Sequence, residues 1–100
     1  MRKTLIICAI LLSQSPALAE VATWYNLPGR KMANGQLFNP KAMTAAHYSH
    51  RLGSVHRICH KGRCIRVKVT DRKPSPGWDL TPTAFRKLAN LKKGVIRVKR

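Results

Sequence analysis

The sequence predicts a single small domain that is mainly β, with one short helix near its C-terminus. Apolar residues alternate with arginine or lysine over Ile65 to Val69 and again over Ile96 to Lys99, which is the period of two that half-buried strands show. With 100 residues, of which 44% are hydrophobic, the chain can bury one core and is too short for two. The sequence contains no internal repeat, low-complexity stretch or heptad pattern.

The charge of the chain is strongly positive. Its 20 lysines and arginines face 3 acidic residues, which gives a formal net charge of +17 at pH 7. A disordered basic tail is excluded, because such tails lack the valine, isoleucine and leucine that recur here. Nucleic acid is the usual partner of such a charge, but the sequence carries no recognised nucleic-acid-binding motif. The kind of partner therefore depends on the compartment.

The N-terminus indicates export. Residues 1–19 begin with a basic pair, continue with an apolar stretch over residues 4–12 and end in the triplet Ala-Leu-Ala, as secretory signal peptides do. The apolar stretch is too short for a bilayer, which needs roughly 20 residues. Because Ile7, which is not small, precedes Cys8, lipid anchoring is not expected. We therefore expect a cleaved signal peptide and one folded domain over residues 20–100, in the periplasm or outside the cell.

Export also decides how the remaining cysteines are interpreted. Cys59 and Cys64 flank a short loop that contains a glycine and separates two β-type segments. In an oxidising compartment such a pair predicts a disulfide that closes a hairpin. A zinc site with His56 and His60 is the alternative, but it would crowd four ligands onto one hairpin. The sequence therefore predicts a disulfide, no metal and no cofactor.

The other elements follow from shorter patterns. Val21 to Tyr25 and Ser54 to Cys59 are further strand candidates, and residues 26–34 contain the proline and glycine of an exposed loop. A helix is predicted over Thr81 to Asn90. Thr81 is a suitable N-cap, a proline follows in the first turn, and a glycine lies beyond the helix end.

Five segments of the chain together form a recognisable pattern through their order and spacing. These segments are Ala22-Thr23-Trp24-Tyr25, Gly29-Arg30-Lys31-Met32-Ala33-Asn34-Gly35-Gln36-Leu37-Phe38-Asn39, Met43-Thr44-Ala45-Ala46-His47, Val69-Thr70-Asp71-Arg72 and Asp79-Leu80-Thr81. In this order and spacing they resemble the rare lipoprotein A family. The resemblance implies a six-stranded double-psi β-barrel, the fold shared with expansins and barwin, and peptidoglycan as the substrate. It also implies an endolytic lytic transglycosylase that cleaves MurNAc-GlcNAc bonds of peptide-free glycan strands and leaves a 1,6-anhydro product.

The number of carboxylates independently limits the chemistry. With Glu20 expected to fray at the mature N-terminus, only Asp71 and Asp79 remain for an ordered site. Ordinary glycoside hydrolysis uses two carboxylates, whereas a lytic transglycosylase can use one as acid and then as base. Asp71 matches the aspartate of the family's Asp-Arg-Gly-Pro motif and is the predicted catalytic residue, although unaligned it would be interpreted as a turn residue. Asp79 is interpreted first as supporting the helix start and second as a catalytic residue.

The resemblance also assigns supporting residues. His47 matches the family's histidine and is predicted to orient the sugar or stabilise charge, with a structural histidine as the equal alternative. Gln36 stands where the family usually carries glutamate, and an amide can bind a sugar hydroxyl but cannot exchange protons. The predicted substrate-binding set is Trp24, Tyr25, Asn34, Gln36, Arg72 and Trp78. For the aromatic members, half-buried core residues are the preferred interpretation over sugar stacking, and no role is expected for His50, His56 or His60.

Two classes of function remain open at this point. One is the transglycosylase, and the other is a peptidoglycan-binding or wall-loosening module that cuts nothing, as in expansins. A cationic protein directed at foreign walls or membranes is a third, weaker interpretation. In each case the positive charge favours retention on anionic envelope polymers or lipid head groups. The sequence gives no indication of the oligomeric state.

Overall fold

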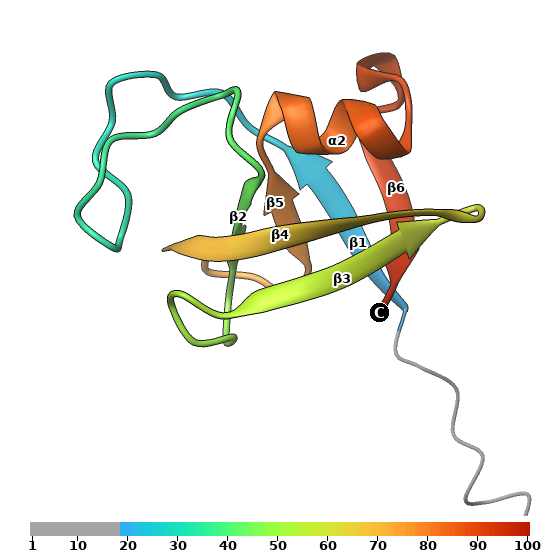
Figure 1. The fold of residues 1–100 in the computed structure, drawn as a ribbon, viewed down its shortest axis with the longest axis horizontal. Coiled ribbons are helices and arrows are strands. Elements are labelled where there is room, and N and C mark those ends of the chain that lie inside the picture. Colours follow the sequence, from blue (N-terminus) through green and yellow to red (C-terminus); the bar gives the residue numbers. More distant parts are fainter. Residues whose placement is uncertain (1–18) are drawn as a thin grey trace, which may run out of the picture.

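The computed structural model describes residues 19–100, so residues 1–18 of the predicted signal peptide lie outside the described part. The described residues form six strands, one α-helix and one 3-10 helix (Figure 1). The elements are β1 (Ala19–Trp24), β2 (Thr44–His47), β3 (Val55–His60), β4 (Arg63–Arg72), β5 (Trp78–Leu80), α2 (Pro82–Leu88), η1 (Leu91–Lys93) and β6 (Val95–Lys99). Among residues 19–100, no helix has the length and apolar character needed to cross a membrane.

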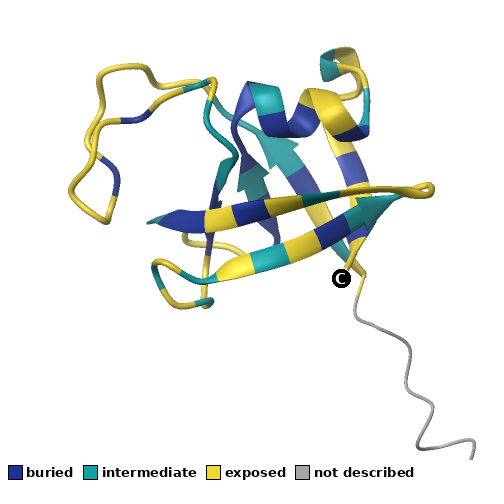
Figure 2. Cartoon of the chain, viewed as in Figure 1, coloured by how far each residue is buried: buried dark blue, intermediate teal, exposed yellow. Residues whose placement is uncertain are grey.

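The six strands close into a barrel in the order β1-β5-β2-β4-β3-β6. β1 pairs in parallel with β5, and β2 in parallel with β4, while the other pairs are antiparallel. The side chains alternate between buried and exposed along β3, β4 and β6, as the period of two predicted (Figure 2). The prediction of a mainly β, six-stranded barrel is confirmed.

The core fills the barrel and extends beneath α2. Its aliphatic and aromatic side chains come from all six strands and from the inner face of the helix. Because this core is continuous, the chain folds as one unit from residue 19 to the last strand. The buried residues are Ala22, Ala45, Ile58, Val67, Val69, Trp78, Leu80, Ala84, Phe85, Leu88, Ile96 and Val98.

The hairpin of β3 and β4 carries the predicted disulfide. Cys59 lies directly opposite Cys64 in the antiparallel register, and the two sulfurs are bonded. Lys61 and Gly62 form the turn with φ angles of 47° and 85°, the left-handed pair that tight hairpins favour. With the two sulfurs bonded to each other, neither is available as a metal ligand in this structure.

Helix α2 is shorter than predicted but begins where expected. The Thr81 hydroxyl accepts a hydrogen bond from the Ala84 amide at 3.2 Å and donates one to the Ala42 carbonyl at 2.6 Å. The predicted proline occupies the first turn, and the helix ends at Leu88, before the predicted end. The residues after it form the separate turn η1.

The residue patterns did not predict two of the strands, and the prediction for the N-terminal end of the domain was wrong. β2 and β5 have four and three residues, too short to show an alternating pattern. At the N-terminus, β1 begins at Ala19, which pairs with Lys99. Glu20 is therefore an ordered strand residue, and the prediction that it frays was wrong. Its register partner is Val98 of β6.

Candidate active site

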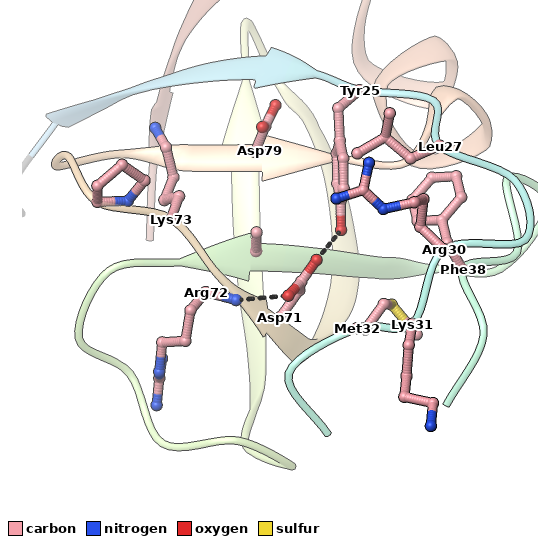
Figure 3. Close-up of a pocket in the computed structure, with 12 residues that line it drawn as sticks. Tyr25, Leu27, Arg30, Lys31, Met32, Phe38, Asp71, Arg72, Lys73 and Asp79 are labelled. Carbon is pink, nitrogen blue, oxygen red and sulfur yellow. Dashed lines mark hydrogen bonds between the residues drawn. The ribbon is translucent and has the colours of Figure 1, made fainter. Parts of the chain in front are cut away.

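A cleft of about 320 Å³ lies beside the end of β4, between the end of β1 and the loop that joins β1 to β2. Figure 3 shows Asp71 next to Tyr25 with basic and apolar side chains around it, and Asp79 at a separate position on another strand. β4 positions Asp71 and β5 positions Asp79, with Ala46 of the intervening strand β2 between them. The lining residues are Tyr25, Leu27, Arg30, Lys31, Met32, Phe38, Ala46, Asp71, Arg72, Lys73, Pro74 and Asp79.

The carboxylate of Asp71 is held by three donors. Its Oδ1 accepts hydrogen bonds from the backbone amides of Ala33 and Arg72, both at 2.9 Å, and its Oδ2 accepts one from the Tyr25 hydroxyl at 3.1 Å. Burial and the charge of Asp71 raise the pKa of Tyr25, so that phenol stays protonated and can donate. An anionic carboxylate can accept all three bonds, and two backbone donors fix its orientation.

The second carboxylate, Asp79, lies in a different environment. It is half-buried in β5 between the fully buried Trp78 and Leu80, and its Oδ1 accepts a hydrogen bond from the Thr23 hydroxyl at 2.8 Å. Burial raises the pKa of Asp79 above its ordinary value, although the Thr23 hydrogen bond and the Lys73 charge act in the opposite direction; the Asp71 charge adds a smaller rise. The cleft thus contains one carboxylate held by three hydrogen bonds and a second one whose pKa burial raises, a difference in environment that sites of acid catalysis also use.

The walls of the cleft are basic and apolar. Arg30, Lys31, Arg72 and Lys73 contribute the charge, and Leu27, Met32 and Phe38 contribute the apolar surface. The Tyr25 and Phe38 rings pack with their centroids 4.7 Å apart, which ties the loop to the end of β1. A cleft with this lining suits a ligand that has both flat apolar faces and negative charge.

Comparison with known proteins agrees with this arrangement. Residues 18–100 match the family model described as lytic transglycolase, which represents the RlpA-like double-psi β-barrel. The chain belongs to the RlpA-like double-psi β-barrel family. The resemblance to rare lipoprotein A predicted from the sequence is confirmed.

Several relatives show how the RlpA-like barrel is used elsewhere. The chain is 41% identical over 85 residues to the uncharacterised protein ssl3177 of Synechocystis, covering 81% of this chain and 93% of that protein. It is 40% identical over 76 residues to a probable endolytic peptidoglycan transglycosylase RlpA of Nostoc, covering 71% of this chain but only 20% of the relative. It is 35% identical over 89 residues to an endolytic peptidoglycan transglycosylase RlpA of Pseudomonas aeruginosa, covering 82% of this chain and 26% of the relative.

A solved structure has the same fold. The Streptomyces papain inhibitor matches this chain with a TM-score of 0.68 and 27% sequence identity, over 85% of this chain and 94% of the inhibitor. The RlpA-like barrel thus spans about a quarter or less of these transglycosylases but nearly all of the inhibitor. The same fold therefore occurs in proteins that are described as transglycosylases and in a protein that is described as an inhibitor.

The RlpA-like barrel places His47 away from the cleft. Ala46 lines the cleft, and consecutive strand residues point to opposite faces, so His47 points to the other side of β2. There its Nε2 lies 3.2 Å from Oε2 of Glu20. The structure therefore does not bring His47 together with Asp71, the pair predicted from the sequence. Arg72 contacts both residues: its guanidinium donates to the His47 carbonyl at 3.1 Å, and its backbone amide donates to Asp71.

Three histidines form a cluster that the sequence did not indicate. The rings of His47 and His50 stack with centroids 4.0 Å apart, and those of His50 and His56 stack at the same distance; we call these three the histidine stack. Burial lowers the pKa of all three below the ordinary value for histidine. No role was expected for His50 or His56 from the sequence. The described fold brings them together against Trp78.

Part of the histidine stack has the spacing of a metal site. Glu20, His47 and His50 each offer one ligand atom, and these atoms lie within 4.8 Å of one another. However, Nδ1 of His47 accepts hydrogen bonds from the amides of Ser49 and His50, both at 3.1 Å. The proton of the neutral ring must then lie on Nε2, where it is donated to Glu20. The lone pair that a metal would need is therefore already used in hydrogen bonding.

The predicted aromatic residues are divided between core and cleft. Trp78 is fully buried, and its indole Nε1 donates to Oε1 of Glu20 at 2.8 Å. The Trp24 indole donates to the Leu91 carbonyl at 3.0 Å and packs against the core. Neither ring lines the cleft, whereas Tyr25 does. The core alternative therefore describes the two tryptophans, because their polar atoms have partners inside the protein.

The loop residues Asn34 and Gln36 lie outside the lining of the cleft. The Asn34 side-chain amide donates to Oε1 of Gln36 at 3.1 Å, and the Gln36 backbone amide donates to Oδ1 of Asn34 at 3.0 Å. The Asn34 backbone amide donates to the Thr70 carbonyl at 3.1 Å, and this bond anchors the loop tip to β4. These bonds hold the loop in the position from which Ala33 donates to Asp71.

Sequence reasoning placed Asp79 as structural first and catalytic second, and it missed most of the basic wall. Asp79 was interpreted as supporting the helix start, but it belongs to β5 and lines the cleft. The alternation Trp-Asp-Leu, with apolar residues on both sides of the aspartate, was the available signal. Arg30, Lys31 and Lys73 carried no distinctive signal among 20 basic residues.

Proposed function

We propose that this chain is an exported RlpA-like domain that cleaves peptidoglycan glycan strands as an endolytic lytic transglycosylase. The observation that supports the proposal is the cleft that Asp79, with its raised pKa, shares with the firmly bonded Asp71 across Ala46 of β2. The names of the relatives agree with a glycan strand as substrate and with a place in the cell envelope. The reaction requires no cofactor.

In the proposed reaction, Asp79 donates its proton to the glycosidic oxygen between MurNAc and GlcNAc as the bond to C1 breaks. The Asp79 carboxylate then takes the proton of the MurNAc C6 hydroxyl while O6 bonds to C1, which closes the 1,6-anhydro ring and restores the acid. No water enters the reaction. Asp71 stabilises the positive charge that develops at C1. This assignment moves the acid from Asp71, predicted from the sequence, to Asp79.

The basic wall suits this substrate. Each MurNAc of a peptide-free strand carries a free lactyl carboxylate, and Arg30 and Lys31 would meet it at the mouth of the cleft. Tyr25 would contribute an aromatic face for a sugar ring. His47 would act as a positioning residue, because its carbonyl binds Arg72 next to Asp71.

Product analysis tests the proposal. Purified protein is incubated with peptide-free glycan strands, and mass spectrometry detects anhydromuramoyl ends. We expect such ends with the unsubstituted protein and a loss of about 100-fold or more in Asp79→Asn, which keeps the size of the side chain but cannot supply the proton. Hydrated reducing ends in place of anhydro ends would contradict the mechanism.

A second candidate function is a peptidoglycan-binding module without catalysis. It is supported by Gln36 at a position where the sequence resemblance expects glutamate, and by the match to an inhibitor over 94% of that chain. The same assay separates the two functions. Binding to glycan strands with no new chain ends would favour the module, and anhydro ends would exclude it.

A further inference from the structure

One side of the barrel carries basic residues without carboxylates. On the adjacent strands β4, β3 and β6, five outward positions are occupied by Arg66, Lys68, Arg57, Arg97 and Lys99, all exposed. We call these five residues the cationic face. The three acidic side chains of the sequence all lie elsewhere, with Glu20 against His47 and Trp78, and with Asp71 and Asp79 in the cleft.

The cationic face breaks a rule of strand pairing. Arg57 lies directly opposite Arg66 in the antiparallel register, and the two flank a shallow hollow of about 200 Å³. Like charges at directly opposed positions destabilise a sheet. Natural sequences break such rules mostly at functional sites. Two guanidinium groups at opposed positions can share an anionic oxygen group between them.

The same side of the barrel also exposes valines. Val55 of β3 lies opposite Lys68, Val21 of β1 lies opposite Arg97, and Val95 begins β6. Their exposed fractions are 57%, 42% and 58%. A soluble polyanion gains nothing from apolar side chains between the cations, whereas a lipid interface binds both cationic and apolar side chains. The mixture therefore favours a bilayer over a soluble polymer.

We propose that the cationic face and its valines bind the surface of an anionic lipid bilayer. Arginine and lysine contact the head-group phosphates, and the valines reach the boundary with the acyl chains. The cleft is lined by a separate set of residues, none of which belongs to the cationic face. The protein can therefore be held at a membrane while the cleft stays free. The proposal does not depend on glycan cleavage.

Vesicle sedimentation tests the proposal with matched variants. The protein is mixed with vesicles of phosphatidylglycerol and phosphatidylcholine, or of phosphatidylcholine alone. Each cation near an anionic bilayer strengthens binding about fivefold, so we expect the double variant R57Q/R66Q to bind ~25-fold more weakly. The double variant R86Q/K87Q on α2 removes the same charge from exposed helix positions and is expected to bind like the unsubstituted protein.

A third variant separates the bilayer from a soluble polymer. Val55→Ser is expected to weaken vesicle binding several-fold and to leave binding to free polyphosphate unchanged. Circular dichroism confirms that each variant is folded, and cleavage of soluble glycan strands by R57Q/R66Q is expected to be unchanged. The proposal is overturned by an absence of vesicle binding, by equal losses in the two double variants, or by binding to polyphosphate alone.

Discussion

Glu20→Ala is the substitution for which the structure gives the largest stability effect outside the core. The Glu20 carboxylate accepts hydrogen bonds from two buried side chains, Trp78 at 2.8 Å and His47 at 3.2 Å. Trp78 is fully buried and His47 is 1% exposed, so neither can turn to solvent for a new partner. Leaving a buried donor unpaired costs about 1–3 kcal/mol.

With two donors affected, we expect Glu20→Ala to lower the free energy of unfolding by about 2–4 kcal/mol. In a domain of this size that corresponds to a fall in Tm of at least about 8 °C. Urea unfolding with the disulfide intact, followed by tryptophan fluorescence, measures the change. Glu20→Gln is the control, because its amide oxygen can still accept from Trp78, and it should lose less than half as much.

A loss below about 0.5 kcal/mol in Glu20→Ala would refute this reasoning, since it is the size of an ordinary surface substitution. It would mean that the N-terminal part of β1 frays, as the sequence alone had suggested. Equal losses in Glu20→Ala and Glu20→Gln would show that the negative charge matters and the acceptor does not. Either result would change the account of how β1 closes the barrel.

Three further predictions follow from individual contacts. Tyr25→Phe removes a donor to Asp71, and we expect glycan cleavage to fall about tenfold or more with little change in Tm, measured by product release. Because the pKa values in the histidine stack are lowered on folding, their contribution to stability is complete above about pH 6.5 and is lost as pH falls below it; Tm should fall from pH 7 to pH 5, and His50→Phe should reduce that fall. Gly77 has a φ of 103°, and an added Cβ would lie 2.6 Å from the Val21 carbonyl oxygen, so Gly77→Ala should cost about 1–3 kcal/mol of stability in urea unfolding; a neutral effect would contradict the close approach.

The parts of the fold that the sequence predicted are those with a repeated local signal. β4 and β6 alternate apolar and basic residues over several positions, and Thr81 with the following proline marks the helix start. β2 and β5 are too short for such a signal, and their place in the barrel depends on parallel pairing with β4 and β1. Long-range pairing of this kind leaves no trace in one sequence.

The candidate site was predicted in part. The motif resemblance located Asp71, Tyr25 and Arg72, which all line the cleft. It could not show that β2 turns His47 away from Asp71, because the direction of a side chain depends on strand register. Asp79 was placed as structural before catalytic for the same reason, since its position in the cleft depends on the pairing of β5 with β1 and β2. The sequence therefore indicated which residues could belong to the site, but it did not indicate the direction in which their side chains point.

The most direct test of the proposed function is the analysis of chain ends after incubation with peptide-free glycan strands, comparing the unsubstituted protein with Asp79→Asn. The asparagine side chain keeps an oxygen that can accept from Thr23, so the fold should be retained, as Tm can verify. The account predicts anhydromuramoyl ends with the unsubstituted protein and about 100-fold fewer with the variant. Equal numbers of anhydromuramoyl ends from a folded Asp79→Asn protein would contradict it.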